Sequence, residues 1–543
     1  MDRREFLLSA GAAGAMGAMG AMSLTGCDRA RPPLPPGELL GASPGFGHRL
    51  RDGDIPPAAS AQTQRHAVVI IGGGIAGLSA AWRLKKAGVD DFVLCELESS
   101  VGGNSRWGEN AVTAYPLAAH YLPLPTREAR YVRELLADLG VLHGDPHAQT
   151  PRYDEQYLCH APQERLFRNG MWQESIMPQA GLTPAERAQL QRFSETMAEY
   201  KGLRGRDGRK AFALPLDLSS RDPALLALDR TSMRDWMMKQ GFDSQPLHWY
   251  VNYACRDDYG TTSADTSAWA GIHYFACRDG EALDAASDIM LTAPEGNGWI
   301  VRRLEQQLQR HLLTDAMCLR IGSGKRRATA EVFLRNENRM LRFDAAQLIW
   351  AAPAFLLPYV WQDAPPALAD AARSVSYAPW LVANLALDRL PQERLGAPLS
   401  WENVLYDSHG LGYVCATHQK IRTRPGPTVL TYYHVLSDLA PQMGRAELLA
   451  ATRESWAETI LAELERPHPG LREITTRLDV CRYGHAMARP TPGTMWHGQR
   501  QTLTRPYGRI QLAHADQSGL SLFEEANYRG VIAAERAMRT LGV

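Results

Sequence analysis

The sequence predicts an α/β fold built around a parallel sheet, and three observations carry that prediction. An apolar, β-branched run at 66–71 is typical of a buried parallel strand. A glycine-rich turn at 72–77 follows it directly, and 78–87 has the pattern of an amphipathic helix. A second apolar strand at 91–95 then ends in an acid, Glu96. Together they form a βαβ unit.

The turn has the GxGxxG spacing of a dinucleotide-binding motif. Gly72 permits the tight turn, Gly74 lets the backbone approach a pyrophosphate, and Gly77 lets the helix pack on the strand. The helix N-terminus attracts phosphate charge, and Glu96 can accept hydrogen bonds from a ribose. The alternative is a glycine-rich turn without a ligand. The expected cofactor-binding residues here are Gly72, Gly73, Gly74, Ile75, Ala76, Gly77 and Glu96.

The continuation Glu96-Leu97-Glu98-Ser99-Ser100-Val101-Gly102-Gly103-Asn104 resembles the extended FAD motif of the flavin amine oxidase superfamily. That superfamily includes monoamine and polyamine oxidases, protoporphyrinogen oxidases and carotenoid desaturases. The resemblance implies non-covalent FAD in a Rossmann-like domain of the glutathione-reductase type, joined to a discontinuous α+β substrate domain. It adds Gly102, Gly103 and Asn104 to the expected cofactor contacts. Asn104 stands where the family usually has arginine.

The resemblance extends to the C-terminus. Residues 508–519, followed by a helix near Glu524, are similar to the closing FAD motif of the family, which implies that Asp516 and Ser518 bind the cofactor. Residues 291–298 and 343–353 are similar to the segments that return to the FAD domain. The implied boundaries are 65–115, 291–355 and 501–543 for the FAD-binding domain, with 116–290 and 356–500 for the substrate domain.

Catalytic positions of the family are replaced here. Its flavin-facing lysine aligns with Ala383, and its aromatic cage aligns near Ala486 and Leu522. Because flavin itself carries the hydride, these losses count more against an amine substrate than against an oxidoreductase. His485, as a proton acceptor, flavin hydrogen-bond donor or covalent attachment point, and His120 are the catalytic candidates. The alternative for His485 is a satisfied core histidine.

Two further clusters are candidates for the substrate pocket. Residues 256–259 hold the adjacent carboxylates Asp257 and Asp258, with His273-Tyr274 nearby in sequence. Paired carboxylates could bind a cationic polyamine or act as bases, whereas surface or capping roles are the alternative. Tyr432-Tyr433-His434 could line the pocket or simply alternate through a buried strand.

The amino end has the features of an export signal. Arg3-Arg4 precede an apolar run in a pattern similar to a bacterial twin-arginine signal, and Leu24-Thr25-Gly26-Cys27 resembles a lipobox. The expected partners are the twin-arginine export machinery and, through a lipidated Cys27, the membrane. Residues 1–27 would be the signal and the proline-rich stretch 28–64 an extended tether. The expected location is extracytoplasmic, in the periplasm.

Composition excludes several other classes. The 543 residues include 59 basic and 59 acidic side chains, and no basic stripe with aromatics points to nucleic acid. Beyond Cys27, seven scattered cysteines without a CxxC pair argue against a disulfide framework and a zinc site, so no metal is expected. A single disulfide stays open as an alternative if the protein is exported.

The leading functional hypothesis is an exported FAD-dependent oxidoreductase that transfers a hydride from a small-molecule substrate to flavin. A cationic amine or polyamine is the substrate class that the family suggests. One alternative is FAD-dependent desaturation of a non-amine substrate. The other is a lipid-anchored flavoprotein that transfers electrons or binds a ligand without amine oxidase activity.

Overall fold

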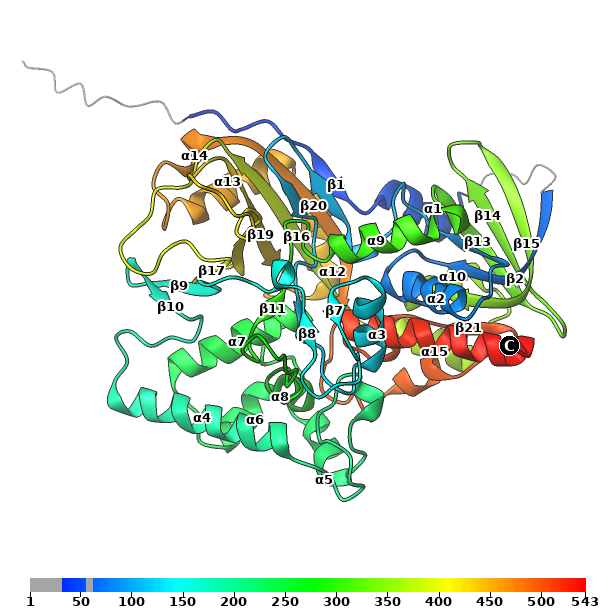
Figure 1. The fold of residues 1–543 in the computed structure, drawn as a ribbon, viewed down its shortest axis with the longest axis horizontal. Helices are drawn as coiled ribbons and strands as arrows, with labels where there is room; N and C mark the ends of the chain where they lie inside the picture. Colours follow the sequence, from blue (N-terminus) through cyan, green and yellow to red (C-terminus); the bar gives the residue numbers. More distant parts are fainter. Residues whose placement is uncertain (1–31, 55–61) are drawn as a thin grey trace, which may run out of the picture. The chain divides into compact units, whose positions relative to one another are not determined.

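The computed structural model describes residues 32–54 and 62–543, and residues 34–543 form one compact unit (Figure 1). The expectations for Arg3-Arg4 and Cys27 lie outside the described residues. Two large sheets organise the chain, one of seven strands and one of eight. The mixed α/β class with a parallel Rossmann-like core is confirmed.

The seven-stranded sheet contains the predicted βαβ unit. Its strands are β2 (Gln62–Ile71), β3 (Phe92–Cys95), β12 (Leu312–Leu313), β13 (Ala316–Ser323), β14 (Ala328–Leu334), β15 (Arg339–Trp350) and β21 (Ile510–Leu512). The order is β12-β3-β2-β15-β14-β13, with β21 also beside β15. Strands β12, β3, β2, β15 and β21 run parallel, whereas β14 and β13 continue antiparallel. Segments far apart in sequence therefore share one sheet.

Helices cover both faces of this sheet. Those of one face are α2 (Ile75–Lys86), α3 (Arg130–Asp138), α9 (Gly298–Leu308) and α15 (Phe523–Leu541), and the other face carries α10 (Leu357–Val360) and α11 (Pro366–Ser374). Helix α15 packs directly on α2, where a Cβ on Gly530 would lie 2.0 Å from the Ala76 carbonyl oxygen. Only glycine allows that approach.

The eight-stranded sheet forms the second layer system. Its strands are β1 (Leu39–Gly41), β9 (Glu164–Arg168), β10 (Met171–Glu174), β16 (Tyr377–Leu387), β17 (Glu402–Leu405), β18 (Gly412–Cys415), β19 (Thr428–Val435) and β20 (Thr475–Ala488). The order is β1-β20-β16-β19-β18-β17-β9-β10. Helices α12 (Pro441–Ala450), α13 (Arg453–Leu464) and α14 (Leu471–Ile474) pack with the core on one face. The residues of the other face, among them Val382 and Tyr433, belong to a separate core cluster.

A helical lobe has its own core of aromatic and methionine side chains. It consists of α4 (Pro184–Gly202), α5 (Pro223–Leu226), α6 (Met233–Lys239), α7 (Gln245–Tyr259) and α8 (Ala268–Ala276). A capping box between Thr183 and Glu186 starts α4. Three short pairs complete the fold: β4 (Trp107–Glu109) with β5 (Ala114–Pro116), β6 (Leu122–Pro123) with β11 (Met290–Leu291), and β7 (Leu142–His143) with β8 (Arg152–Tyr153).

Part of the proline-rich stretch differs from the extended tether expected over 28–64. Within it, β1 pairs with β20 and α1 (Pro44–Asp52) packs against α10. Proline-rich composition disfavours an independent core, but backbone pairing at a sheet edge needs no core of its own.

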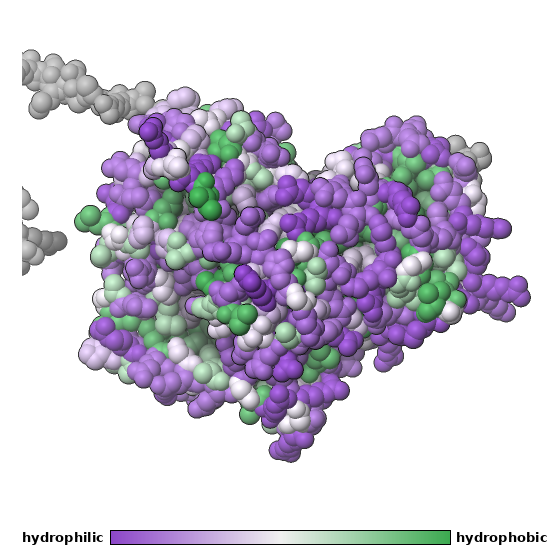
Figure 2. Space-filling model, in the orientation of Figure 1, coloured by the Kyte–Doolittle hydropathy of each residue, from purple (hydrophilic) through white to green (hydrophobic). Residues whose placement is uncertain are grey.

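The described cysteines and surface add two observations. All seven cysteines in residues 32–54 and 62–543 are buried and unpaired. No helix in this part of the chain has the length and apolar character that crossing a membrane requires. The face in Figure 2 is mostly hydrophilic, with small scattered hydrophobic areas.

Candidate active site

A cavity of about 800 Å³ is lined by residues of both sheets and of the helical lobe. The turn between β2 and α2 contributes Gly72, Gly74, Ile75 and Ala76. The strands of the other sheet contribute Val382, Tyr433 and Tyr483, and α7 contributes Asp257 and Asp258. The predicted dinucleotide turn and the predicted carboxylate pair therefore open into one space.

The glycine turn has the geometry that the motif requires. Gly72 has φ +107°, and a Cβ there would lie 2.7 Å from the Ala351 carbonyl carbon. At Gly74 a Cβ would meet nothing within 4 Å, so the backbone faces open cavity at the N-terminus of α2. At Gly77 a Cβ would lie 1.9 Å from the Gly72 oxygen, so a side chain would push α2 off the turn. Open space beside a helix N-terminus suits a pyrophosphate.

Glu96 lies beside this turn and lines the cavity. Its carboxylate accepts hydrogen bonds from the backbone N–H groups of Gly73, at 2.6 Å, and Glu98, at 2.9 Å. Burial raises the pKa of Glu96, and the two backbone donors oppose that rise. Gly102 donates its N–H to the Gly73 oxygen at 2.7 Å, which fixes the second glycine pair next to the first.

Asn104 and Asp516 extend the site toward the other sheet. The Asn104 amide donates to the Ala486 carbonyl oxygen at 2.8 Å, and Asn104, Gly102 and Gly103 all line the cavity. Asp516 Oδ2 accepts from the Ala354 N–H, at 2.8 Å, and the Tyr377 hydroxyl, at 2.5 Å. Burial alone would raise the pKa of Asp516, but His514 and these donors hold it below its usual value.

The other oxygen of Asp516, Oδ1, lies 3.1 Å from His514 Nδ1, but that nitrogen accepts the Asp516 N–H. Oδ1 therefore accepts no hydrogen bond although the residue is 1% exposed. An unsatisfied buried carboxylate oxygen is costly, so this atom is suited to a hydroxyl of a bound molecule. With the open turn at Gly74, it makes the cavity fit FAD. Ser518, by contrast, does not line the cavity: it donates to Glu525 at 2.5 Å and accepts from Arg529 at 2.9 Å.

His120 lies in an aromatic group on the cavity wall. Its ring centroid is 4.4 Å from that of Tyr433, 5.0 Å from that of Tyr121 and 5.6 Å from that of Trp401. Burial lowers the pKa of His120 to about 3, so the imidazole is neutral, and its Nε2 has no hydrogen-bond partner. A neutral ring with a free nitrogen can contact substrate without repelling a cation.

Three carboxyl groups lie at or beside the same space: Asp257 and Asp258 line the cavity, and Glu402 lies next to it without lining it. Burial, and then the charge of Asp258, raise the pKa of Asp257 to about 7; burial, and then the charge of Asp257, raise that of Glu402 to about 8. The Tyr253 hydroxyl donates to Glu402 at 2.9 Å. Arg278 pairs with Asp258 at 2.6 Å, but no ion pair in residues 32–54 and 62–543 involves Asp257 or Glu402.

His485 contacts a different group. It lines the cavity from β20, stacks on Phe355 with ring centroids 4.3 Å apart, and meets Tyr377 edge-on at 5.6 Å. His485 is exposed and is therefore not a core histidine, but desolvation by the cavity walls still lowers its pKa. The two histidines proposed from sequence both face the cavity, but at different ends. His120 lies at the carboxyl chamber, the end of the cavity around Asp257, Asp258 and Arg278, whereas His485 lies beside the Tyr377–Asp516 pair.

Strand β16 corrects the sequence alignment. Trp380 and Val382 line the cavity, whereas Ala383 packs in the core on the opposite face of the sheet. Side chains alternate along a strand, so an error of one residue reverses the face. Ala486 and Leu522, the expected cage positions, do line the cavity and are not aromatic.

Sequence reasoning missed several wall residues. Tyr483 donates its hydroxyl to the Leu117 oxygen at 3.1 Å, as Tyr433 does to the Ala118 oxygen at 2.9 Å. Alternation along β16 and β20 would have predicted Trp380 and Tyr483. No local sequence motif marks Arg278 or Glu402 as a functional residue. His273 donates its Nε2–H to the Ala213 carbonyl oxygen at 3.0 Å and lies outside the cavity lining.

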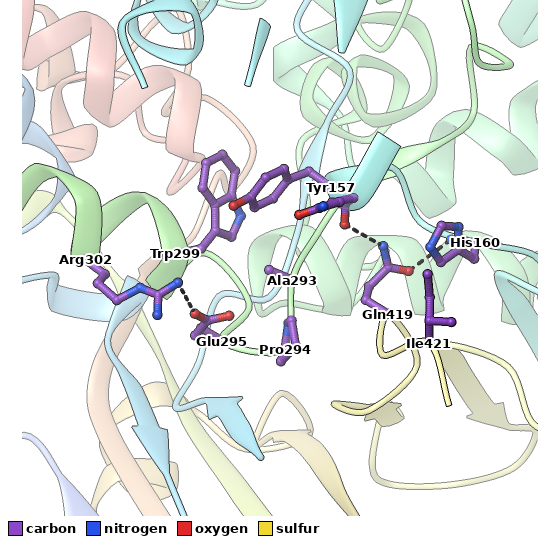
Figure 3. A pocket seen from close by; sticks show the side chains of 10 residues that line it. Tyr157, His160, Ala293, Pro294, Glu295, Trp299, Arg302, Gln419 and Ile421 are labelled. Atoms are coloured by element: carbon purple, nitrogen blue, oxygen red, sulfur yellow. Dashed lines mark hydrogen bonds and ion pairs between the residues drawn. The ribbon is translucent and has the colours of Figure 1, made fainter. Parts of the chain in front are cut away.

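A second, smaller cavity of about 350 Å³ lies beside the N-terminal end of α9 (Figure 3). Tyr157 packs on Trp299 with ring centroids 4.5 Å apart, and Arg302 pairs with Glu295 at 2.7 Å. Gln419 uses its amide for backbone groups, including the His160 N–H at 3.0 Å. These polar groups already have partners. Within the described parts of the chain, no cluster of three or more metal-ligating side chains occurs.

Two known proteins match a short stretch of this sequence. Mitochondrial dimethylglycine dehydrogenase of Homo sapiens is 44% identical over 68 residues, which are 12% of this chain and 8% of that protein. The Baeyer-Villiger monooxygenase peniC of Penicillium patulum is 44% identical over 66 residues, again 12% of this chain and 11% of the relative. The chain thus spans only about a tenth of the length of these relatives.

Solved structures match over most of the chain. Putrescine oxidase bound to putrescine has a TM-score of 0.64 at 16% identity, and cyclohexylamine oxidase from Brevibacterium oxydans one of 0.62 at 14%; each match covers 88% of this chain and 100% of the other. A CLA-producing fatty acid isomerase from P. acnes has a TM-score of 0.60 at 16% identity, covering 87% and 98%. At this identity the likeness shows the fold alone.

The family model described as flavin containing amine oxidoreductase matches residues 75–538, most of the chain. That span includes the second half of the glycine turn, the carboxyl chamber and the Asp516 segment. The chain belongs to the flavin containing amine oxidoreductase family, a family of FAD-dependent oxidoreductases.

Proposed function

We propose that this protein oxidises a small amine carrying a second cationic group, by hydride transfer from the carbon next to the nitrogen to FAD. The carrying observation is the pair Asp257 and Glu402, two buried carboxyl groups without an ion-pair partner among the described residues. Asp257 lines the same cavity as the dinucleotide turn, and Glu402 lies behind that wall, near enough for the charge of Asp257 to raise its pKa. A cation that entered this chamber would neutralise charge that the protein leaves uncompensated.

The chamber residues have separate roles in this proposal. Asp257, with a pKa of about 7, accepts a proton from the reacting ammonium, because hydride loss requires the free amine. Glu402, held by the Tyr253 hydroxyl, attracts the distal cation. The neutral His120 ring and Tyr433 pack against the alkyl chain between the two nitrogens. FAD, when bound, would supply the hydride acceptor, and water would hydrolyse the iminium that leaves the site.

The first test is anaerobic reduction of the oxidised holoenzyme. We expect a diamine to bleach the flavin absorbance, a monoamine of the same chain length to do so weakly, and the matching alcohol to have no effect. Asp257→Asn should slow reduction by about 100-fold, since the loss of a positioned base typically costs at least that much in rate. Asp235→Asn is the control, because Asp235 is 57% exposed on α6.

Other outcomes would overturn the proposal. Bleaching by an unsaturated or saturated lipid but by no amine would favour the non-amine alternative, which the likeness in fold to a fatty acid isomerase supports. Bleaching by dithionite alone would favour electron transfer without amine oxidation.

We also propose that the protein is exported through its twin-arginine signal and anchored through Cys27. The support is the order of Arg3-Arg4, an apolar run and a lipobox-like end. Cell fractionation tests this: Arg3→Lys with Arg4→Lys should keep the protein in the cytoplasm, and Cys27→Ala should release it from the membrane fraction. Unchanged fractionation of both variants would contradict it.

A further inference from the structure

Residues 37–52, here called the strap, cross from one sheet system to the other. The strap contains β1, at the edge of the eight-stranded sheet, and α1, against α10 of the other domain (Figure 1). Its two ends are therefore held by different halves of the cavity wall.

The first end is anchored by backbone contacts with β20. Leu39, Leu40 and Gly41 pair with Val480, Cys481 and Arg482 in parallel register. A Cβ on Gly41, at φ +111°, would lie 2.6 Å from the Arg482 carbonyl oxygen. The chain therefore needs glycine at the point where it leaves the sheet.

The second end is anchored on the dinucleotide side. Ser43 donates its N–H, at 2.9 Å, and its hydroxyl, at 2.7 Å, to the two oxygens of Glu98. The Phe46 ring lies 3.8 Å from the Arg335 guanidinium carbon. Leu50 packs against the core beneath α10.

The inner surface of the strap lines the main cavity. The lining residues include Ala42, Ser43, Pro44, Gly47, His48 and Arg51. A hydrogen-bonded chain joins the strap to the ribose position, because Ser43 holds Glu98 and the Glu98 N–H donates to Glu96 at 2.9 Å. The strap therefore borders the end of the cavity where Glu96 and Gly74 lie.

The hold on α1 is weak. None of its residues is buried, and a nine-residue helix has little stability of its own. Because α1 is short and has few buried contacts, its local opening requires much less free energy than global unfolding. We propose that the strap is part of the FAD site: it closes over the bound cofactor, and its opening sets the rate of FAD release.

The first test measures FAD release from oxidised holoenzyme without substrate, through the rise in flavin fluorescence. Ser43→Ala removes a charge-assisted hydrogen bond, and we expect release about tenfold faster. Ser194→Ala is the control, because Ser194 on α4 bonds only its own helix and lies outside the cavity lining. Its release rate should equal that of the wild type.

A second pair of variants acts at a distance from the cofactor. Gly41→Ala introduces a clash with β20, whereas Gly208→Ala, at φ +75°, has the same kind of backbone strain with no neighbour within 4 Å and lies outside the strap and the cavity lining. We expect faster release only for Gly41→Ala. Hydrogen exchange of residues 43–52 should slow when FAD is added to the apoprotein.

Equal release rates for Ser43→Ala, Gly41→Ala and wild type, with unchanged hydrogen exchange, would overturn the proposal. Because no substrate is present, this result is independent of the proposed amine oxidation. If the strap proposal is contradicted, the flavin-bleaching test of amine oxidation stays valid. If amine oxidation is contradicted, the FAD-release test of the strap stays valid.

Discussion

Asp257 and Glu402 show how burial prepares a carboxyl group for a ligand. An exposed carboxylate is already solvated and gains little from a cation. In the chamber, burial raises the pKa of Asp257 to about 7 and that of Glu402 to about 8, so both change charge near neutral pH. A cation favours the charged form, and the charged form attracts the cation, so binding and ionisation are linked.

That linkage predicts a pH profile for binding. A bis-quaternary diammonium ligand keeps its charge at every pH, so any change in affinity reports on the protein. We expect binding at pH 9 to be at least about tenfold tighter than at pH 6, because the carboxyls are neutral below their raised pKa values. The perturbation of the flavin spectrum on titration measures this. Equal affinities at the two pH values would contradict it.

The same groups make the opposite contribution to stability. Their folded-state pKa values lie above the ordinary carboxyl values, so the unfolded chain ionises first as the pH rises. The stability they contribute is present below about pH 4 and is lost as the pH rises toward 7 to 8. Tight cation binding above neutrality would offset this loss.

At the scale of elements, the sequence predicts those features that depend only on neighbouring residues in the chain. The β2–α2 turn is specified by glycine spacing, and its geometry follows because only glycine fits at Gly72 and Gly77. The face of β16 was misassigned by one residue, since a buried strand is apolar on both faces and its alternation is hidden. Composition alone also predicted a tether where β1 and α1 lie, because edge pairing depends on the partner strand β20.

Contacts between distant segments could not be predicted from the sequence, because they depend on how the chain folds. Arg278, after α8, pairs with Asp258 on α7, and Glu402 on β17 accepts a hydrogen bond from Tyr253 on α7. Neither carries a motif, because their roles depend on tertiary contacts. Asp516, by contrast, was recognisable because it lies next to a helix start in a family pattern.

At the scale of the whole molecule, one buried ionic cluster joins the dinucleotide half to the helical lobe. Arg529, on α15, forms two hydrogen bonds with Asp217, at 2.7 and 2.9 Å, and contacts Ser518. Glu525, also on α15, accepts from Ser518 and from the Leu216 N–H, each at 2.5 Å. Helix α15 thus carries Glu524 to the cavity and fixes residues 216–217 of the lobe.

Breaking this cluster should therefore destabilise both halves together. Arg529→Met removes the cation beside Glu525 and leaves Asp217 with only the more distant Arg221, at 3.9 Å, and we expect a loss of about 3 kcal/mol in the free energy of unfolding, measured with urea on the apoprotein. Arg539→Met, on the exposed last turn of the same helix, should change it by less than about 0.5 kcal/mol. Adding Asp217→Asn to Arg529→Met should recover part of the loss, because it removes one uncompensated charge. A loss for Arg529→Met no larger than that of the control would mean that the cluster does not couple the two halves, and that α15 is held by its packing on α2 alone.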